Sequence, residues 1–408
     1  MKPLRWEENT AIPRCAGALL ASLRFGGGAV ELPACSESEW KTALYFCDRN
    51  QLTLLLNHRL HPRLEKNLAD NRERVTRLKK AFASVKEALD AAGIEFVTLK
   101  GFTHWERFWP DPATRIQYDL DLFCPSAAAG ARDALLGIGY ESLQDREKFP
   151  TDHLPALVRK TGWQWRGDFF DPEIPISVEL HFRLWDESTE GFEAPGVGDF
   201  WPRRVTQSLD GRDYLALDPV DSLGYAALHL LRHLLRGDAR AANVYELAYF
   251  LDRNAGIQEF WERWIGLHPP ELRRLQAIGF RLAAVWFGCR MSPAAQAEVD
   301  LLPASVRRWF EHSAASPLEA FFHPNKDELW LHLCLLDSFR KKSAVLRRRL
   351  LPTRMPAPLD SVYIPEAAMN WRLRVRKRWQ YGRYVVTRGV FHARALLPTL
   401  SSMLKTRF

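Results

Sequence analysis

Residues 118–123, YDLDLF, alternate between apolar and acidic positions. A period of two predicts a β-strand with Leu120 and Leu122 on its buried face and with Asp119 and Asp121 side by side on the other face. Two carboxylates this close repel each other, which favours a cation or several hydrogen-bond donors between them. The strand therefore predicts an acidic site, although similar acids are also common on solvated strand edges.

Residues 176–184, ISVELHFRL, alternate in the same way and predict a second strand, with Glu179 and His181 sharing its polar face. A third carboxylate suits a site in which three acids hold two Mg²⁺ ions across a nucleoside triphosphate. Oxygen ligands favour Mg²⁺ over zinc, with Mn²⁺ as an alternative. The competing interpretation is an exposed strand acid beside a hydrogen-bonded histidine.

The segment before the acidic strand predicts a phosphate-binding turn. Residues 95–99 form a short apolar strand that ends at Lys100 and Gly101, and a helix-like segment follows over 102–109. A strand, a glycine turn and a helix together present backbone N–H groups to a phosphate, and Lys100 adds a positive charge. A tight turn beside a surface lysine is the alternative.

Apolar residues elsewhere recur mostly at intervals of three and four, so we expect considerably more helix than strand. The helices predicted in this way span 37–50, 52–61, 71–92, 126–138, 152–160, 218–236, 241–253, 257–267, 270–287, 303–313 and 328–350. Two more short strands are expected at 140–143 and 162–166, the second pairing with the strand of Glu179. The acidic loop 186–199 is expected to be a flap or a linker.

Composition adds limits on the class of protein. The chain has 408 residues, 47% hydrophobic and 12% aromatic, which is enough for two or three domains with real cores. Its six cysteines are scattered without a C-x-x-C pair, which fits a reducing cytoplasm and no structural zinc site. The charged first residues predict no secretory signal. His229 and His233 lie four residues apart, but without a zinc-protease glutamate between them we expect ordinary interior or groove histidines.

Several of these motifs occur together in a known family. They are LKG at 99–101, a proline-containing loop with Arg115, YDLDLF at 118–123, Gly139-Tyr140 and VELHF at 178–182. In this combination they resemble the uncharacterised nucleotidyltransferase family of the DNA polymerase beta-like superfamily, over roughly residues 91–190. The resemblance implies an α+β fold with a small mixed sheet and helices on one side. It also implies transfer of a nucleoside monophosphate from an NTP, by default ATP, to a hydroxyl of an acceptor.

By this resemblance, Asp119 and Asp121 correspond to the family's pair of metal-binding acids, and Glu179 corresponds to the third metal ligand. Lys100-Gly101 stands where the superfamily has Gly-Ser, so a serine hydroxyl is missing from the triphosphate site. Thr103 is the candidate substitute, and Arg115 is counted with the nucleotide-binding residues.

Two functional interpretations remain open on these residues. In the catalytic one, Glu179 or His181 accepts the proton from the acceptor hydroxyl, and the acceptor is a small molecule, a sugar, a peptide, a protein or an RNA end. In the other, the chain is a non-catalytic nucleotide- or metal-binding module of a biosynthetic or surface-assembly system, and it docks through its basic tail.

The last seventy residues differ from the rest in charge. Residues 339–408 contain 17 Lys and Arg against 2 Asp and Glu, whereas residues 1–338 contain 40 against 47. Basic and aromatic residues alternate there, and such a mixture binds an anionic membrane surface, binds a nucleic acid, or packs on the protein or on a partner. We expect a cytoplasmic or membrane-peripheral protein without a transmembrane segment.

The expected organisation has four parts. Residues 1–90 form an N-terminal helical region, 91–200 a nucleotidyltransferase-like catalytic domain, 201–338 a C-terminal helical domain, and 339–408 the basic, aromatic-rich tail.

Overall fold

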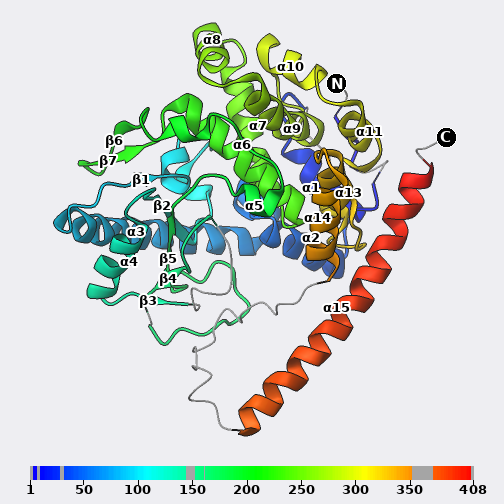
Figure 1. Cartoon of the computed structure of the whole chain (residues 1–408). Helices are drawn as coiled ribbons and strands as arrows, with labels where there is room; N and C mark the ends of the chain where they lie inside the picture. The colour runs from blue at the N-terminus through cyan, green and yellow to red at the C-terminus, as the bar shows by residue number, and fades with distance from the viewer. Residues whose placement is uncertain are drawn as a thin grey trace.

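The computed structural model describes residues 3–6, 10–27, 32–143, 152–159, 161–351 and 371–405. Its strands form one mixed sheet in the order β3-β4-β5-β2-β1-β7-β6, and helices pack on both faces of it (Figure 1). The prediction of a helix-rich α+β fold is confirmed. Helices were expected on one side of the sheet only, and the structure adds the C-terminal helices on the other side.

The sheet is built around two parallel strands from distant parts of the sequence. β2 pairs in parallel with β5 and antiparallel with β1, and β1 pairs in parallel with β7. The strands are β1 Val97–Thr98, β2 Asp119–Phe123, β3 Glu141–Ser142, β4 Leu157–Val158, β5 Ser177–His181, β6 Val205–Leu209 and β7 Arg212–Ala216.

Most of the described chain is helical. The helices are α1 Arg14–Ser22, α2 Glu37–Arg49, α3 Pro62–Ala91, α4 Ala128–Gly137, α5 Glu187–Glu190, α6 Pro219–Arg236, α7 Ala241–Asn254, α8 Gln258–Leu267, α9 Pro270–Phe287, α10 Pro293–Asp300, α11 Ala304–Ser313, α12 Ser316–Glu319, α13 Asp327–Cys334, α14 Phe339–Leu350 and α15 Trp371–Lys405. None of these described helices has the length and apolar character needed to cross a bilayer.

The two faces of the sheet meet different cores. Leu120 and Leu122 of β2 pack with Phe82 and Val85 of α3 in one apolar cluster. Phe123 at the end of β2 belongs to a second, larger cluster that contains the N-terminal helices α1 and α2 and the helices from α6 onward. The polar face of β2 and β5 is therefore turned toward the C-terminal helices.

Two predicted elements between β3 and β5 were wrong. Residues 152–159 are not helical, because Leu154 N donates to Leu180 O at 2.9 Å and Phe182 N donates to Asp152 O at 3.0 Å, which holds this segment along β5. Residue 160 lies outside the described residues. Residues 162–166 form no strand, since Trp163 donates its indole N–H to Asp171 at 2.8 Å and bends the segment into a loop. β4 pairs with β5 instead.

Other predictions placed a segment correctly but assigned it the wrong secondary structure or the wrong role. The expected helices at 52–61 and 102–109 are short 3₁₀ turns, at Thr53–Leu55, His58–Leu60 and Gly101–His104. Residues 186–199 are not a flap, because Asp186, just before α5, and Glu190, the last residue of α5, are both buried. Glu190 accepts a hydrogen bond from Arg236 Nε at 2.9 Å, which ties this segment to α6.

The hairpin of β6 and β7 was missed. It extends the sheet beyond residue 200, where we expected the helical domain to begin. Asp210-Gly211 separates the two strands, and this dipeptide between alternating residues is a strong hairpin signal that could have revealed them.

A test of the turn after β1 compares two glycines. Gly101 has φ +81°, and a Cβ built there would lie 2.1 Å from Nε2 of Gln117, a buried side chain that donates to Asp119 O at 2.7 Å. Gly93 has φ +65° but nothing within 4 Å of such a Cβ. We expect Gly93→Ala to cost about 1 kcal/mol and Gly101→Ala about 2–4 kcal/mol in free energy of unfolding.

Urea denaturation measures both variants. Equal losses at the two positions would show that the contact with Gln117 does not constrain the turn.

Candidate functional site

The register between β2 and β5 assembles the acidic residues. Asp121 is the direct partner of Glu179 in the parallel ladder, Asp119 lies two residues before Asp121, and His181 lies two residues after Glu179. Because residues two apart on a strand share a face, all four side chains point to the same side of the sheet. The structure thus brings together the three acids and the histidine that the sequence singled out.

Distances within this cluster are short. His181 Nε2 lies 3.1 Å from Asp121 Oδ1 and 3.8 Å from Glu179 Oε2. One ligand atom from each of Asp121, Glu179 and His181 lies within 4.8 Å of the other two, the spacing that a shared metal ion needs. Asp119 stands outside this trio, two residues before Asp121 on the same face, and lines the cavity.

The acids differ in exposure and in charge state. The side chain of Asp121 is 1% exposed and that of Glu179 is 26% exposed, so Glu179 is the one that a ligand reaches directly. Burial and the Asp121 charge raise the pKa of both Asp119 and Glu179. Burial opposes ionisation of Asp121 as well, but Lys100 and His181 outweigh it and lower the pKa of this carboxyl.

Lys100 is the cation nearest to the carboxylates. Its Nζ lies 3.4 Å from Asp121 Oδ2 and 3.0 Å from His229 Nε2. Burial alone would lower its pKa, but the three carboxylates prevail and the pKa is raised. Lys100 is therefore a permanent positive charge between the sheet and α6.

The ion pair of Asp152 and Arg232 lies on the Nδ1 side of the His181 ring. His181 Nδ1 lies 3.5 Å from Asp152 Oδ2, and Asp152 pairs with Arg232 of α6. All three side chains are buried. Sequence reasoning missed Asp152 and Arg232, although an arginine in the otherwise apolar run of α6 was a signal that could have found one of them.

Helices α6 and α7 face the acids across a cavity of about 570 Å³. The lining is rich in cations, which are Arg49, Lys100, Arg115, Arg232, Arg236 and Arg240. The acids Asp119 and Glu179 lie on the opposite wall. A volume of this size is within the usual range of small-molecule sites, and the cations suit a polyanionic ligand.

His229 and His233 are interior histidines on this wall. Their Nε2 atoms are 3.1 Å apart, and Asn243 Nδ2 lies 3.2 Å from His229 Nδ1. Burial and the charge of Lys100 hold the pKa of His229 well below its usual value, so it is neutral near pH 7. A neutral ring places no second positive charge beside the ammonium group of Lys100, whose Nζ lies 3.0 Å from His229 Nε2.

Arg115 lines the cavity but is already paired. Its Nε donates to Glu246 Oε1 of α7 at 2.6 Å, and His104 Nδ1 lies 3.7 Å from Glu246 Oε2. Burial opposes the charge of Glu246, yet Arg115 and His104 lower its pKa to about 2. This pair joins the loop before β2 to the C-terminal helices.

Thr103 and Gly101 lie away from the cavity and outside the cluster of acids. Thr103 is buried and donates its hydroxyl to the carbonyl of Leu99, which turns it toward the backbone. Neither residue is among those that line the cavity. Thr103 therefore does not present its hydroxyl where the missing serine would.

The cluster has the donor set of a divalent-metal site. One ligand atom from each of Asp121, Glu179 and His181 lies within reach of a single ion. Asp121 Oδ2 and His181 Nδ1 are buried and lack a well-formed hydrogen bond from the described residues, although Lys100 Nζ lies 3.4 Å from the first and Asp152 Oδ2 lies 3.5 Å from the second. Carboxylate oxygens favour Mg²⁺ or Mn²⁺, whereas an imidazole is a ligand of many transition metals, so these residues define a metal site without selecting the ion.

A family model for uncharacterised nucleotidyltransferases matches residues 37–288, which is more than half of the chain, and the protein belongs to that family. No curated protein and no solved structure matches it.

Replacing Glu246 by glutamine tests the Arg115 pair through pH. Because the folded pKa of Glu246, about 2, lies below its ordinary value of 4.5, the ionised group stabilises the fold above pH 4.5 and loses this effect as the pH falls toward 2. We expect Glu246→Gln to lower the free energy of unfolding by about 3 kcal/mol at pH 7. This loss should stay constant down to about pH 4.5 and become smaller below that pH.

Urea denaturation at a series of pH values measures this difference. Glu259→Gln, on the exposed surface of α8, is the matched control and should change little at any pH. A cost for Glu246→Gln that stays the same at pH 3.5 would contradict the pairing.

Proposed function

We propose that this protein is a Mg²⁺-dependent nucleotidyltransferase that moves a nucleoside monophosphate from an NTP, by default ATP, to a hydroxyl of an acceptor. The observation that carries the proposal is the alignment of Asp121 with Glu179 in neighbouring strands, with Asp119 beside them and a cation-lined cavity in front. Family membership supports the general chemistry.

Asp119, Asp121 and Glu179 are the proposed metal-holding residues. Bound divalent cations would neutralise charge on the attacking and leaving oxygens of the phosphoryl transfer. Asp121 is fixed on one side by His181 and on the other by Lys100, which holds its carboxylate in one orientation beside Glu179. This preorganisation is what makes a small set of acids effective in a site that excludes water.

Glu179 is the better candidate for the general base. His181 is 1% exposed and its ring is held between Asp121 and Asp152, so an acceptor hydroxyl does not reach it. Glu179 lines the cavity, and its raised pKa makes it a stronger base than an ordinary glutamate.

The proposed step is an in-line displacement. The acceptor oxygen attacks the alpha phosphorus, the bond to the beta-bridging oxygen breaks, pyrophosphate leaves, and the acceptor proton passes to Glu179. Positioning accounts for much of the rate in such reactions.

Lys100, Arg236 and Arg240 are the proposed triphosphate contacts. They line the same cavity, and they come from the turn after β1 and from the end of α6 and the loop that follows it. For Lys100 we propose the phosphate-binding role that the sequence predicted. Arg115 is paired with Glu246 instead and supports the wall of the cavity.

One observation favours the non-catalytic alternative. Lys100 Nζ already neutralises Asp121 at 3.4 Å, so the acids are balanced in part by the protein itself. If that ion pair replaces a metal, the chain binds nucleotide without turnover. The two functions differ in whether nucleotide binding requires Mg²⁺ and whether label reaches an acceptor.

Thermal denaturation tests the metal-dependent binding of nucleotide. We expect Mg²⁺ with ATP, but not ATP alone, to raise the melting temperature by about 2–5 °C, because the ligand binds only the folded state. Asp119→Asn combined with Asp121→Asn should abolish the rise. The exposed pair Asp213→Asn and Asp300→Asn is the control and should leave it unchanged.

An unchanged rise in the Asp119 and Asp121 double variant would rule out the metal site. Because each protein is compared with and without ligand, any effect of the substitutions on stability itself cancels.

Label transfer tests the reaction. Incubation with an NTP labelled at the alpha phosphate and with cell extract should label an acceptor, whereas the same NTP labelled at the gamma phosphate should not. Glu179→Gln should lower labelling at least about 100-fold, because both a metal ligand and the proposed base are lost.

Transfer of the gamma label would indicate phosphorylation instead of nucleotidyl transfer. Binding of Mg²⁺ and ATP without transfer of either label would favour the non-catalytic module.

A further inference from the structure

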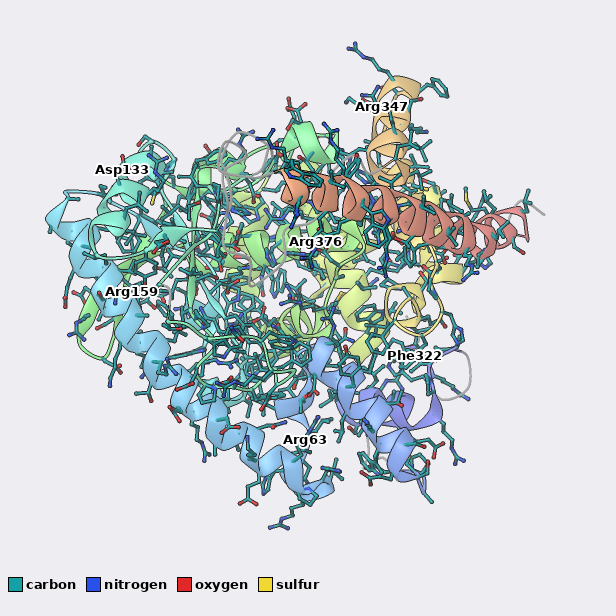
Figure 2. All side chains as sticks on the ribbon, turned by 90° about the horizontal axis from the view of Figure 1, so that it is seen from below. Arg63, Asp133, Arg159, Phe322, Arg347 and Arg376 are labelled. Atoms are coloured by element: carbon teal, nitrogen blue, oxygen red, sulfur yellow. The ribbon has the colours of Figure 1, made fainter. Side chains whose placement is uncertain are left out.

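Helix α15 is the element that the proposed function leaves unused. It spans 35 residues, Trp371–Lys405, and contains nine Lys and Arg and no Asp or Glu. Figure 1 shows it running past α13 and α14, with its first half extending beyond the rest of the fold. In Figure 2, where Arg376 is labelled, it lies across the front of the view.

The second half of α15 is attached to the body by one face. His392, Ala395 and Thr399 are buried at intervals of three and four. Thr399 Oγ1 accepts from Lys326 N at 2.9 Å and donates to Asp327 Oδ1 at 2.6 Å, at the start of α13. This contact fixes which side of the helix faces the protein and which side faces away.

The side that faces away is apolar over the whole length of the helix. Its large side chains are between 47% and 68% exposed, and they are Trp371, Val375, Trp379, Val386, Val390, Leu397, Leu400 and Leu404. Together with Gly382 and Ala393, they recur at steps of four, four and three residues. At 100° per residue these positions stay within about a third of a turn, so they form one continuous stripe opposite the buried face.

Cations border this stripe on both sides. Arg376, Arg383 and Arg394 follow one edge, and Arg374 and Arg378 lie at the other edge of the first half. All five are exposed. An exposed apolar stripe with tryptophans, flanked by arginines and free of acids, is the composition of a helix that lies in the headgroup region of an anionic bilayer.

We propose that the outer face of α15 docks the protein onto an anionic membrane surface, with the helix parallel to the surface. The apolar stripe enters the boundary of the acyl chains, and the arginines on its edges contact lipid phosphates. The inner face keeps its contacts with α13, so the rest of the protein is held beside the membrane. Membrane docking through this face is a property separate from nucleotidyl transfer, and it does not depend on the proposed function.

The geometry favours a membrane over a nucleic acid. A strand-binding surface places cations and stacking rings along its centre, whereas here six of the eight large side chains of the stripe are valines and leucines, which do not stack on bases, and the arginines lie at its edges. It also favours a membrane over a second copy of the chain. Two such helices paired along their stripes would bring arginines against arginines, without the opposite charges that coiled-coil edges use.

Vesicle binding of the full chain tests the proposal. The protein should sediment with vesicles of phosphatidylcholine and phosphatidylglycerol, but much less with phosphatidylcholine alone, and added salt should weaken the binding. Trp379→Ser combined with Val386→Ser and Val390→Ser should weaken it roughly 100-fold. Arg376→Gln combined with Arg383→Gln and Arg394→Gln should weaken it at least about tenfold.

A control variant carries three substitutions of exposed apolar residues by serine outside α15. Ile257→Ser, Ile265→Ser and Leu301→Ser replace side chains that are 48%, 47% and 63% exposed, and this variant should bind vesicles like the original protein. Serine has nearly the helix propensity of valine, so circular dichroism should show that α15 persists in the stripe variant.

Three results would overturn the proposal. These are vesicle binding that the stripe variant retains, binding to RNA but not to vesicles, and a dimer in solution that the stripe variant dissociates while vesicle binding is absent.

Discussion

The parallel pairing of β2 with β5 is the interaction on which the rest of this structure depends. It places Asp121 opposite Glu179 and brings His181 beside them, although β5 lies more than fifty residues further along the chain. A slip of one residue in this register would send these side chains to opposite faces. Leu120, Leu122, Val178 and Leu180, packed on the other face beneath α3 and α4, make such a slip costly, so the apolar core specifies the geometry of the polar site.

Collecting acids in a partly buried place has an electrostatic cost that the fold offsets with cations from other elements. Lys100 pairs with Asp121, Arg232 with Asp152, and Arg115 with Glu246. The pairs Arg232–Asp152 and Arg115–Glu246 join segments beside the sheet to α6 and to α7. Lys100 reaches α6 through His229 instead. The contacts that lower the pKa of Asp121 and Glu246 therefore also hold the sheet against the C-terminal helices, and the cavity lies between the two.

Helix α15 uses its two faces for different purposes. The inner face joins α13 through Thr399, and its residues near Arg388 and Phe391 line a second cavity with Arg348 and Arg349. This second cavity shares Arg236 and Gly237 with the one in front of the acids, so the tail reaches close to the proposed active site. The second cavity therefore connects α15, which carries the proposed bilayer-binding face, to the proposed nucleotide cavity.

The sequence by itself determined the alternation in β2 and β5, the faces on which Asp119, Asp121, Glu179 and His181 lie, the helix-rich character of the chain and the charge of its tail. Each of these follows from local periodicity or composition, which do not require knowledge of distant contacts. Only the tertiary structure decided that Asp152 and Arg232 support His181, that Arg115 is paired with Glu246, and that Thr103 turns away from the cavity. Those outcomes depend on which helix packs against which face of the sheet, and residues far apart in the chain settle that packing together.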